Sequence, residues 1–139
     1  EKSFWDVIEI STDPIIASHS NCYSLNPHYR NLTDEQIKAI AEKGGYIGIN
    51  FYNKFLVKSG GADIEDVVRH IDHLKDLVGV DYIGIGADFD GGITPPAGLE
   101  DVTRYPELTS ALLQRGYTKE DVTKILGGNF LRVYKQVCG

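Results

Sequence analysis

The chain has 139 residues, of which 42% are hydrophobic and 24% are charged, and this size suits a single globular domain over residues 1–139. The formal net charge of −6 is spread along the chain, which argues against nucleic acid or anionic lipid as partners. No apolar run approaches the roughly 20 residues that span a bilayer, and residues 1–5 lack the basic and apolar layout of a signal peptide.

Two features of the composition bear on context. Cys22 and Cys138 are the only cysteines, and they lie far apart in no metal-binding spacing. We therefore expect a reducing, cytoplasmic location rather than a secreted domain held by disulfides. A chain that begins at Glu1 and contains no methionine is expected to be a piece of a longer polypeptide.

Short apolar runs alternate with amphipathic helical stretches, which is the pattern of parallel strands joined by crossover helices. Residues 3–10 form the predicted end of a helix with Ser3 as its cap, and Pro14 prevents its continuation. The first predicted strand runs from Ile15 to His19 and is followed by a polar loop over residues 20–32.

The second and third units repeat this order. Thr33 is the predicted N-cap of a helix that ends at Gly44 and Gly45, and a strand is predicted from Tyr46 to Tyr52. A further helix is predicted between a cap at Asp63 and an end at Gly79. Its apolar positions recur at helical spacing and are Ile64, Val67, Val68, Ile71, Leu74 and Leu77.

The third predicted strand, Tyr82 to Asp88, is followed by a long loop and then only by helices. Pro106 begins one helix, Thr118 caps another, and the last segment is amphipathic. Three strand-helix units suit a small three-layer sandwich or the C-terminal part of an eight-stranded (β/α)8 TIM barrel, which takes about 250 residues. The length favours the barrel fragment, whose two open sheet edges must then be covered by something else.

Polar residues stand where the predicted strands end. The first strand ends on His19, the second on the segment Asn50 to Tyr52, and the third on Asp88 and the following Phe89-Asp90. The carboxyl ends of parallel strands are where active sites form, and an imidazole with a carboxylate suits zinc and a metal-activated water. A hydrogen-bonded structural histidine and a simple Asp-Gly turn explain the same residues equally well.

Other candidate residues are interpreted more simply. Arg30 is suited to bind a carboxylate through its guanidinium, although from the sequence alone a solvated loop arginine is the simpler interpretation. Cys22 and His28 are interpreted as loop residues. His70 and His73, three positions apart on one predicted helix, are interpreted as packing residues.

Several strings occur in a fixed order along essentially all 139 residues: SHS with YRN close behind, NFYN, GADFDG, GLEDV before YPEL, and GGNFLRV. In this order and spacing they resemble the renal (membrane) dipeptidase family of zinc-dependent enzymes. The resemblance implies a metal-dependent-hydrolase (β/α)8 barrel with two zinc ions that cleaves dipeptides and tolerates D-amino acids at the C-terminal position. Some members of that family also cleave β-lactam analogues.

The resemblance also assigns roles by position. His19 resembles the second of two histidines that hold one zinc, and Arg30 resembles the group that binds the free carboxylate of the substrate. Asp88 resembles the carboxylate that passes a proton from the metal-bound water to the leaving amine, whereas no metal-ligand role is assigned to Asp90. The family's His-x-Asp pair, bridging glutamate and earlier histidine have no counterpart here, so we expect this chain alone neither to bind zinc tightly nor to hydrolyse dipeptides.

The leading hypothesis is therefore a zinc dipeptidase that needs a missing N-terminal portion. One alternative is a non-catalytic half-barrel whose open edges pair with a second copy, forming a homo-oligomer. The other is a related metal-dependent amidohydrolase with a different amide substrate, because barrels host many reactions on similar sites. The mass in solution and the metal content distinguish the half-barrel from the leading hypothesis, because the half-barrel alternative predicts a zinc-free dimer.

Overall fold

The computed structural model describes residues 2–139, and its sheet contains three parallel strands in the order β1, β2, β3. The strands are β1 (Ile16–Ala17), β2 (Tyr46–Ile49) and β3 (Ile83–Ile85). Ile47 of β2 pairs with Ala17 on one side and with Ile83 on the other. Because adjacent strands are parallel, each connection must cross from one end of the sheet to the other, and helices make these crossovers.

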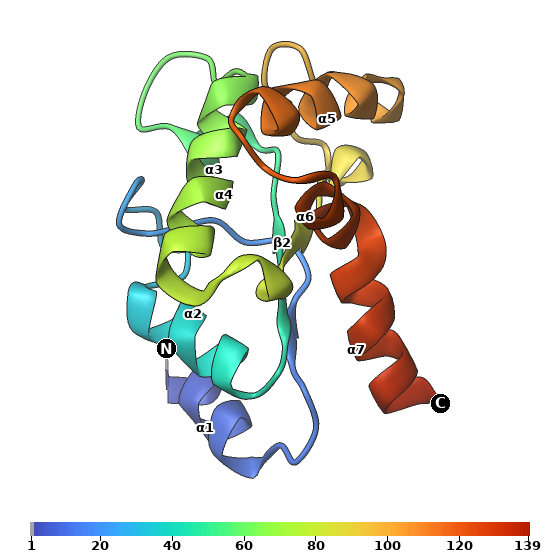
Figure 1. Ribbon diagram of the computed structural model, residues 1–139. Helices are drawn as coiled ribbons and strands as arrows, with labels where there is room; N and C mark the ends of the chain where they lie inside the picture. Colours follow the sequence, from blue (N-terminus) through green and yellow to red (C-terminus); the bar gives the residue numbers. More distant parts are fainter. Residues whose placement is uncertain (1) are drawn as a thin grey trace.

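Helices flank the sheet on both sides. Figure 1 shows α2 and α4 on one side of β2 and α6 and α7 on the other. The helices are α1 (Lys2–Ile10), α2 (Asp34–Glu42), α3 (Asn53–Leu56), α4 (Ile64–Val78), α5 (Tyr105–Gln114), α6 (Lys119–Thr123) and α7 (Asn129–Cys138), with a π-helical turn at Lys124–Gly128. Short 3-10 turns lie at Val80–Tyr82, Phe89–Gly91 and Val102–Arg104.

The core lies between the sheet and the helices that cover it. Three isoleucines of β2 and β3 and the apolar face of α4 belong to one buried cluster. The members from these elements are Ile47, Ile49, Ile83, Val67, Val68, Ile71 and Leu74. Burial of an aliphatic side chain contributes about 1.5–3 kcal/mol, so the predicted stripe of α4 is a main source of stability.

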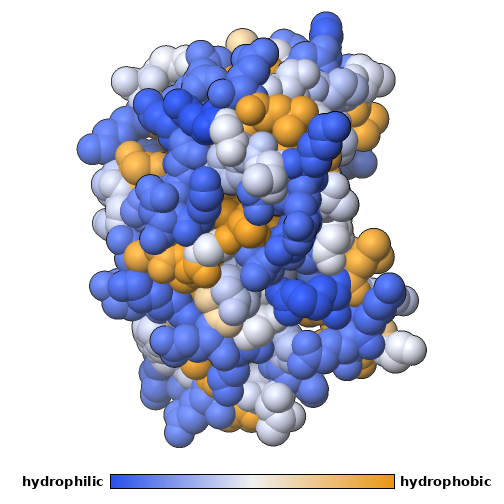
Figure 2. All heavy atoms as spheres, in the orientation of Figure 1, coloured by the Kyte–Doolittle hydropathy of each residue, from blue (hydrophilic) through white to orange (hydrophobic). Residues whose placement is uncertain are grey.

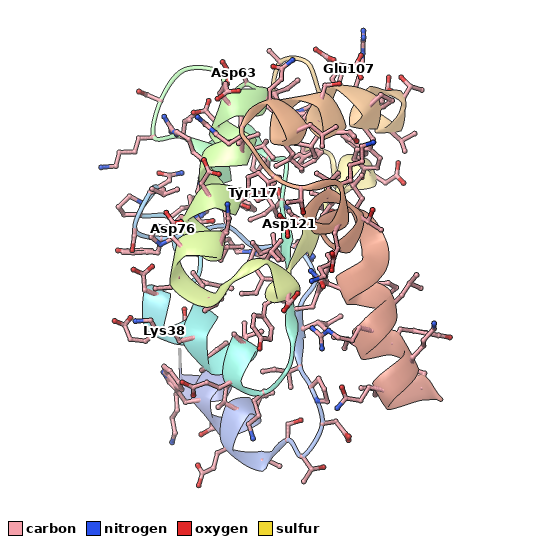
Figure 3. All side chains as sticks on the ribbon, in the orientation of Figure 1. Lys38, Asp63, Asp76, Glu107, Tyr117 and Asp121 are labelled. Carbon is pink, nitrogen blue, oxygen red and sulfur yellow. The ribbon has the colours of Figure 1, made fainter. Side chains whose placement is uncertain are left out.

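The predicted caps of three helices are confirmed. Thr33, Asp63 and Thr118 each accept a hydrogen bond from the backbone N–H three residues later, and the side chain at that later position bonds back to the cap. This reciprocal pair of hydrogen bonds is a capping box. Asp63 and Asp121 belong to the boxes at the starts of α4 and α6, and both are labelled in Figure 3. The predicted Ser3 cap is wrong, because Lys2 before it is already helical and Ser3 lies within α1.

The strands are shorter than the predicted ranges 15–19, 46–52 and 82–88. Beyond the ordered pairs the chain still follows the sheet, since Ser20 N–H donates to Gly48 O at 2.8 Å. Gly48 and Gly86 have no side chain there, and a Cβ on either would overlap the carbonyl oxygen of Ser18. The segment after β1 therefore bends across the ends of β2 and β3 instead of continuing as a regular strand.

The visible surface is mostly hydrophilic, with apolar side chains gathered in small patches (Figure 2). None of the helices in the part of the chain that the structure describes has the length and apolar character needed to cross a membrane.

Candidate functional site

The three polar strand ends lie at one edge of the sheet because β1, β2 and β3 run in the same direction. His19 stands two residues after β1, Asn50 directly after β2, and Asp88 three residues after β3. Gly86 brings the β3 end against the first of these segments, since a Cβ on it would lie 3.0 Å from the Cα of His19. The sequence-predicted positions of His19 and Asp88 thus belong to adjoining segments of the backbone.

His19 is half-buried and contacts two neighbours through its ring nitrogens. Its Nδ1 lies 2.8 Å from Ser18 Oγ, and its Nε2 lies 3.4 Å from Nη2 of Arg30. A guanidinium only donates, so Nε2 accepts and the ring proton sits on Nδ1, facing the serine oxygen. This tautomer carries its lone pair on Nε2, the nitrogen that would ligate a metal ion if Arg30 released its hydrogen bond.

Arg30 is exposed, and its guanidinium reaches back from the loop after β1 to His19. The backbone of Arg30 is held by its neighbour, because its N–H donates to His28 Nδ1 at 3.2 Å. The His28 ring in turn packs on Phe55, with ring centroids 4.7 Å apart. The structure therefore brings together His19 and Arg30, which the sequence separates by a polar loop.

Asp88 is exposed and adopts a left-handed backbone conformation with φ of 64°. This conformation is uncommon for a residue with a side chain and is best tolerated by Asp and Asn. The chain then turns back, because Gly91 N–H donates to the carbonyl of Asp88 at 2.9 Å. A Cβ on Gly91 would lie 2.6 Å from Asp88 Oδ1, so the turn packs closely around the carboxylate.

Two buried asparagines connect these segments, and sequence reasoning assigned neither of them a role. Asn21 Nδ2 donates to Asn50 O at 3.0 Å, and Asn50 N–H donates to Asn21 Oδ1 at 2.9 Å. Asn50 Nδ2 lies 3.4 Å from Asp88 Oδ2. The only sequence signal was the position of Asn50 at a strand end, since Asn21 stands in a polar loop with no distinguishing pattern.

Other candidate residues serve the packing of the chain. His70 is fully buried, its Nδ1 accepts from Cys22 N–H at 3.1 Å, and its Nε2 donates to Leu56 O at 3.1 Å. Burial lowers the pKa of His70 to about 4 and raises the pKa of the Cys22 thiol to about 12. His73 joins α4 to α2 through Asp34 Oδ1 at 2.8 Å, so the packing role predicted for both histidines is confirmed. Cys22 lies in a loop as predicted but within the apolar core, which the sequence did not indicate.

Metal ligands are few at this edge of the sheet. Within residues 2–139, no three or more His, Cys, Asp or Glu side chains are grouped so that they hold a metal ion. A catalytic zinc takes about three protein ligands, and His19 offers one neutral imidazole nitrogen. The imidazole of His19 is a suitable zinc ligand, but the described residues supply only part of the ligand set that a zinc site needs.

Residues 1–138 match the sequence profile of the membrane dipeptidase family, peptidase family M19. The chain belongs to this family. It is 45% identical over 141 residues to an uncharacterized Klebsiella pneumoniae protein encoded in the pqqA 5′ region, and 41% identical over 138 residues to the dipeptidase tcpJ of Claviceps purpurea. Each match covers 99% of this chain, but the chain spans only 52% and 32% of those two relatives.

A solved structure shares the same fold. It is a metallopeptidase from Rhodobacter sphaeroides, liganded with a phosphinate mimic of the dipeptide L-Ala-D-Ala, and it superimposes with a TM-score of 0.92 at 40% identity. The match covers 98% of this chain and 40% of that one. The predicted α/β class and the predicted family are therefore confirmed.

Proposed function

We propose that the chain is the C-terminal part of a (β/α)8 zinc dipeptidase that becomes active when an N-terminal portion completes the barrel. The observation that carries this proposal is the family match over residues 1–138, with His19, Arg30 and Asp88 following parallel strands at one sheet edge. The dipeptide mimic bound to the Rhodobacter enzyme supports dipeptides as the substrate class.

Each residue has a role that its surroundings suit. His19 would hold one zinc through Nε2 while Nδ1 stays bonded to Ser18, and this requires the guanidinium of Arg30 to leave Nε2. When bound, zinc lowers the pKa of a coordinated water so that hydroxide forms near neutrality. Arg30 is exposed and its guanidinium would bind the free carboxylate of the dipeptide, which sets the position of the scissile bond. Asp88 would accept a proton at its carboxylate and deliver it to the leaving amine.

The open side of the sheet supports the need for a further portion. An apolar groove of about 300 Å³ lies beside β1 and is lined by Ile16, Tyr46, Ile85, Leu126 and Phe130, with Ser18 and Gly127. Ile16, on the edge strand β1, is 47% exposed. The groove runs across the three strands to the unpaired edge of β1, and exposed apolar surface and an open strand edge are both stabilised when another segment covers them. The additional length of the relatives would supply that cover.

The test is a chimera in which this chain replaces the matching segment of the Rhodobacter metallopeptidase, assayed for L-Ala-D-Ala hydrolysis with added zinc. We expect activity in the chimera, and we expect Asp88→Ala to lower kcat by about 10²-fold or more, as for loss of a proton-transfer group. His19→Ala should abolish activity at low zinc. Arg30→Ala should raise KM by about tenfold, because a charge-assisted carboxylate contact is lost.

Two variants serve as matched controls. Asp90→Ala removes the second, exposed carboxylate of the same motif, and Arg69→Ala removes an exposed arginine on α4. Both should retain the kinetic constants of the parent chimera. Activity that is unchanged by His19→Ala and by Asp88→Ala would refute the proposed site.

A further inference from the structure

Asn50 is held in one orientation by the chain around it. Its side chain is fully buried, and its Oδ1 accepts a hydrogen bond from Tyr52 N–H at 2.6 Å. Because an N–H must face Oδ1, the two amide protons on Nδ2 must face the opposite direction. In that direction, among the described residues, the partner of Nδ2 is Oδ2 of Asp88 at 3.4 Å.

Asn21 fixes the backbone of Asn50 at the same time. The Asn21 side chain bonds both the N–H and the carbonyl of Asn50, and Asn21 is itself 1% exposed. Asn21 stands two residues after His19, so the segment that carries the histidine and the strand end that carries Asn50 are joined by two buried hydrogen bonds. Buried amide pairs of this kind are rigid, since any movement leaves polar groups without partners.

Asp88 needs such support because its carboxylate is exposed and lies in a short turn. An exposed carboxylate samples several rotamers, whereas proton transfer requires a fixed distance to the reacting atoms. Asn50 Nδ2 donates to one carboxylate oxygen, and Gly91 leaves room for the other. If the carboxylate swung away, the buried Nδ2 would lose its hydrogen bond, which is unfavourable.

We propose that Asn50 is a positioning residue that holds the Asp88 carboxylate in the orientation used for proton transfer, with Asn21 holding Asn50 in register with the His19 segment. This inference rests on the proposed dipeptidase function for the meaning of Asp88. The contact itself, however, is a property of this chain and is tested without any activity.

The first experiment measures the contact by NMR on the 139-residue chain without metal. Asp88→Gly removes the carboxylate, and glycine adopts φ of 64° without strain. We expect the Asn50 side-chain Nδ2 resonances to shift clearly in this variant. The matched control is Asn129, a buried amide whose Nδ2 bonds Val80 O and Ile83 O, and its resonances should stay in place. Unchanged Asn50 resonances would overturn the inference.

The second experiment measures the role in the chimera described above. Asn50→Ala should lower kcat by about tenfold while KM stays within about twofold, because the lost hydrogen bond orients the group that transfers the proton and does not contact the substrate. In the Asp88→Gly background, Asn50→Ala should cause no further loss of kcat. Asn129→Ala should lower stability but leave the kcat of the folded enzyme unchanged.

The outcomes separate the two proposals. Losses of kcat that multiply in the double variant would show that Asn50 acts independently of Asp88 and would overturn the inference. A chimera that is inactive throughout would count against the dipeptidase function, and the NMR result would then decide the Asn50–Asp88 contact by itself.

Discussion

At the scale of single residues, two glycines allow the segment after β1 to cross the ends of the neighbouring strands. Gly48 and Gly86 both face the carbonyl of Ser18, and no side chain fits between them and that backbone. The close approach brings His19 toward the β3 end that carries Asp88. These glycines therefore shape the candidate site without contributing any chemistry.

We expect Gly86→Ala to lower the free energy of unfolding by about 1–3 kcal/mol, because the added Cβ overlaps backbone atoms that cannot move freely. Gly61→Ala is the control, since a Cβ there meets nothing within 4 Å, and its effect should stay within about 0.5 kcal/mol. Urea unfolding of both variants measures the difference. Equal stability of the two variants would contradict the close approach.

His70 makes the stability of the chain depend on pH. Burial holds its pKa at about 4 in the folded chain, below the ordinary value of 6.5 in the unfolded chain. The neutral ring therefore stabilises the fold fully above pH 6.5, and that contribution is lost as the pH falls from 6.5 toward 4, at up to about 1.4 kcal/mol per unit. The hydrogen bonds to Cys22 and Leu56 require this neutral form.

The matching prediction compares the native chain with His70→Gln by urea unfolding at pH 7, 6 and 5. Glutamine does not titrate, so the stability advantage of the native chain should shrink as the pH is lowered. All other titrating groups are shared by the two chains and cancel in the difference. A difference that stays constant from pH 7 to 5 would rule out a neutral buried His70.

At the scale of secondary-structure elements, local capping defines where several helices begin. The box formed by Thr118 and Asp121 starts α6 directly after the turn that ends α5. Farther along the chain, two polar side chains of α7 bond the amino ends of the strands. Asn129 donates to the carbonyl of Ile83 in β3, and Arg132 donates to the carbonyl of Gly45, just before β2. Caps thus set the helix starts, and polar side chains tie α7 to the sheet.

Thr118→Ala should lower the free energy of unfolding by about 1 kcal/mol, because the N–H of Asp121 loses its acceptor. Thr123→Ala is the control within the same helix. Thr123 Oγ1 bonds back to Lys119 O, an interaction that contributes little to helix stability, so this change should be close to neutral. Thermal or urea unfolding distinguishes the two, and a larger effect at Thr123 would contradict the capping assignment.

At the scale of the whole molecule, the apolar groove beside β1 is the surface on which we expect the chain to associate. Its lining residues come from or adjoin all three strands, the π-helical turn and the start of α7, and they include exposed Ile16 and Phe130. A barrel that closes removes such an edge altogether, whereas a half-barrel alone would pair its edge with a second copy. The two outcomes have different masses in solution.

The corresponding prediction uses the portion of the Klebsiella relative that this chain does not cover, expressed separately and titrated with the chain. Ile16→Lys should weaken that association by at least about tenfold, because an unpaired ammonium would be buried in the groove. The stability of the chain alone should change little, since Ile16 is 47% exposed. Leu113→Lys, at a 41% exposed position on α5, is the control and should bind like the native chain.

Sedimentation of the native chain completes this test. We expect a monomer that forms a one-to-one complex with the added portion. A stable homodimer that fails to bind that portion, and whose dimerisation is abolished by Ile16→Lys, would favour the self-associating half-barrel instead. In that case the groove is an interface between copies of this chain.

The starts of three helices and the family were predictable from the sequence because their signals are local. A capping residue and its partner are three positions apart, as for Thr33 and Gln36, and the strings that resemble the dipeptidase family are contiguous. Strand lengths were overestimated, since apolar runs do not reveal where a chain bends over its neighbours. Three parallel strands separated by helices were nevertheless as expected.

By itself, the sequence determined the α/β class, the membership of the dipeptidase family, and the positions of His19 and Asp88 near strand ends and of Arg30 in the loop after the first strand. Only the tertiary structure decided which side chains meet: the contact of His19 with Arg30, the burial of His70 against Cys22, and the link from Asn21 through Asn50 to Asp88. The physical reason is separation along the chain. Asn50 is 29 residues from Asn21 and 38 from Asp88, so packing of the sheet, and no local pattern, brings their polar atoms together.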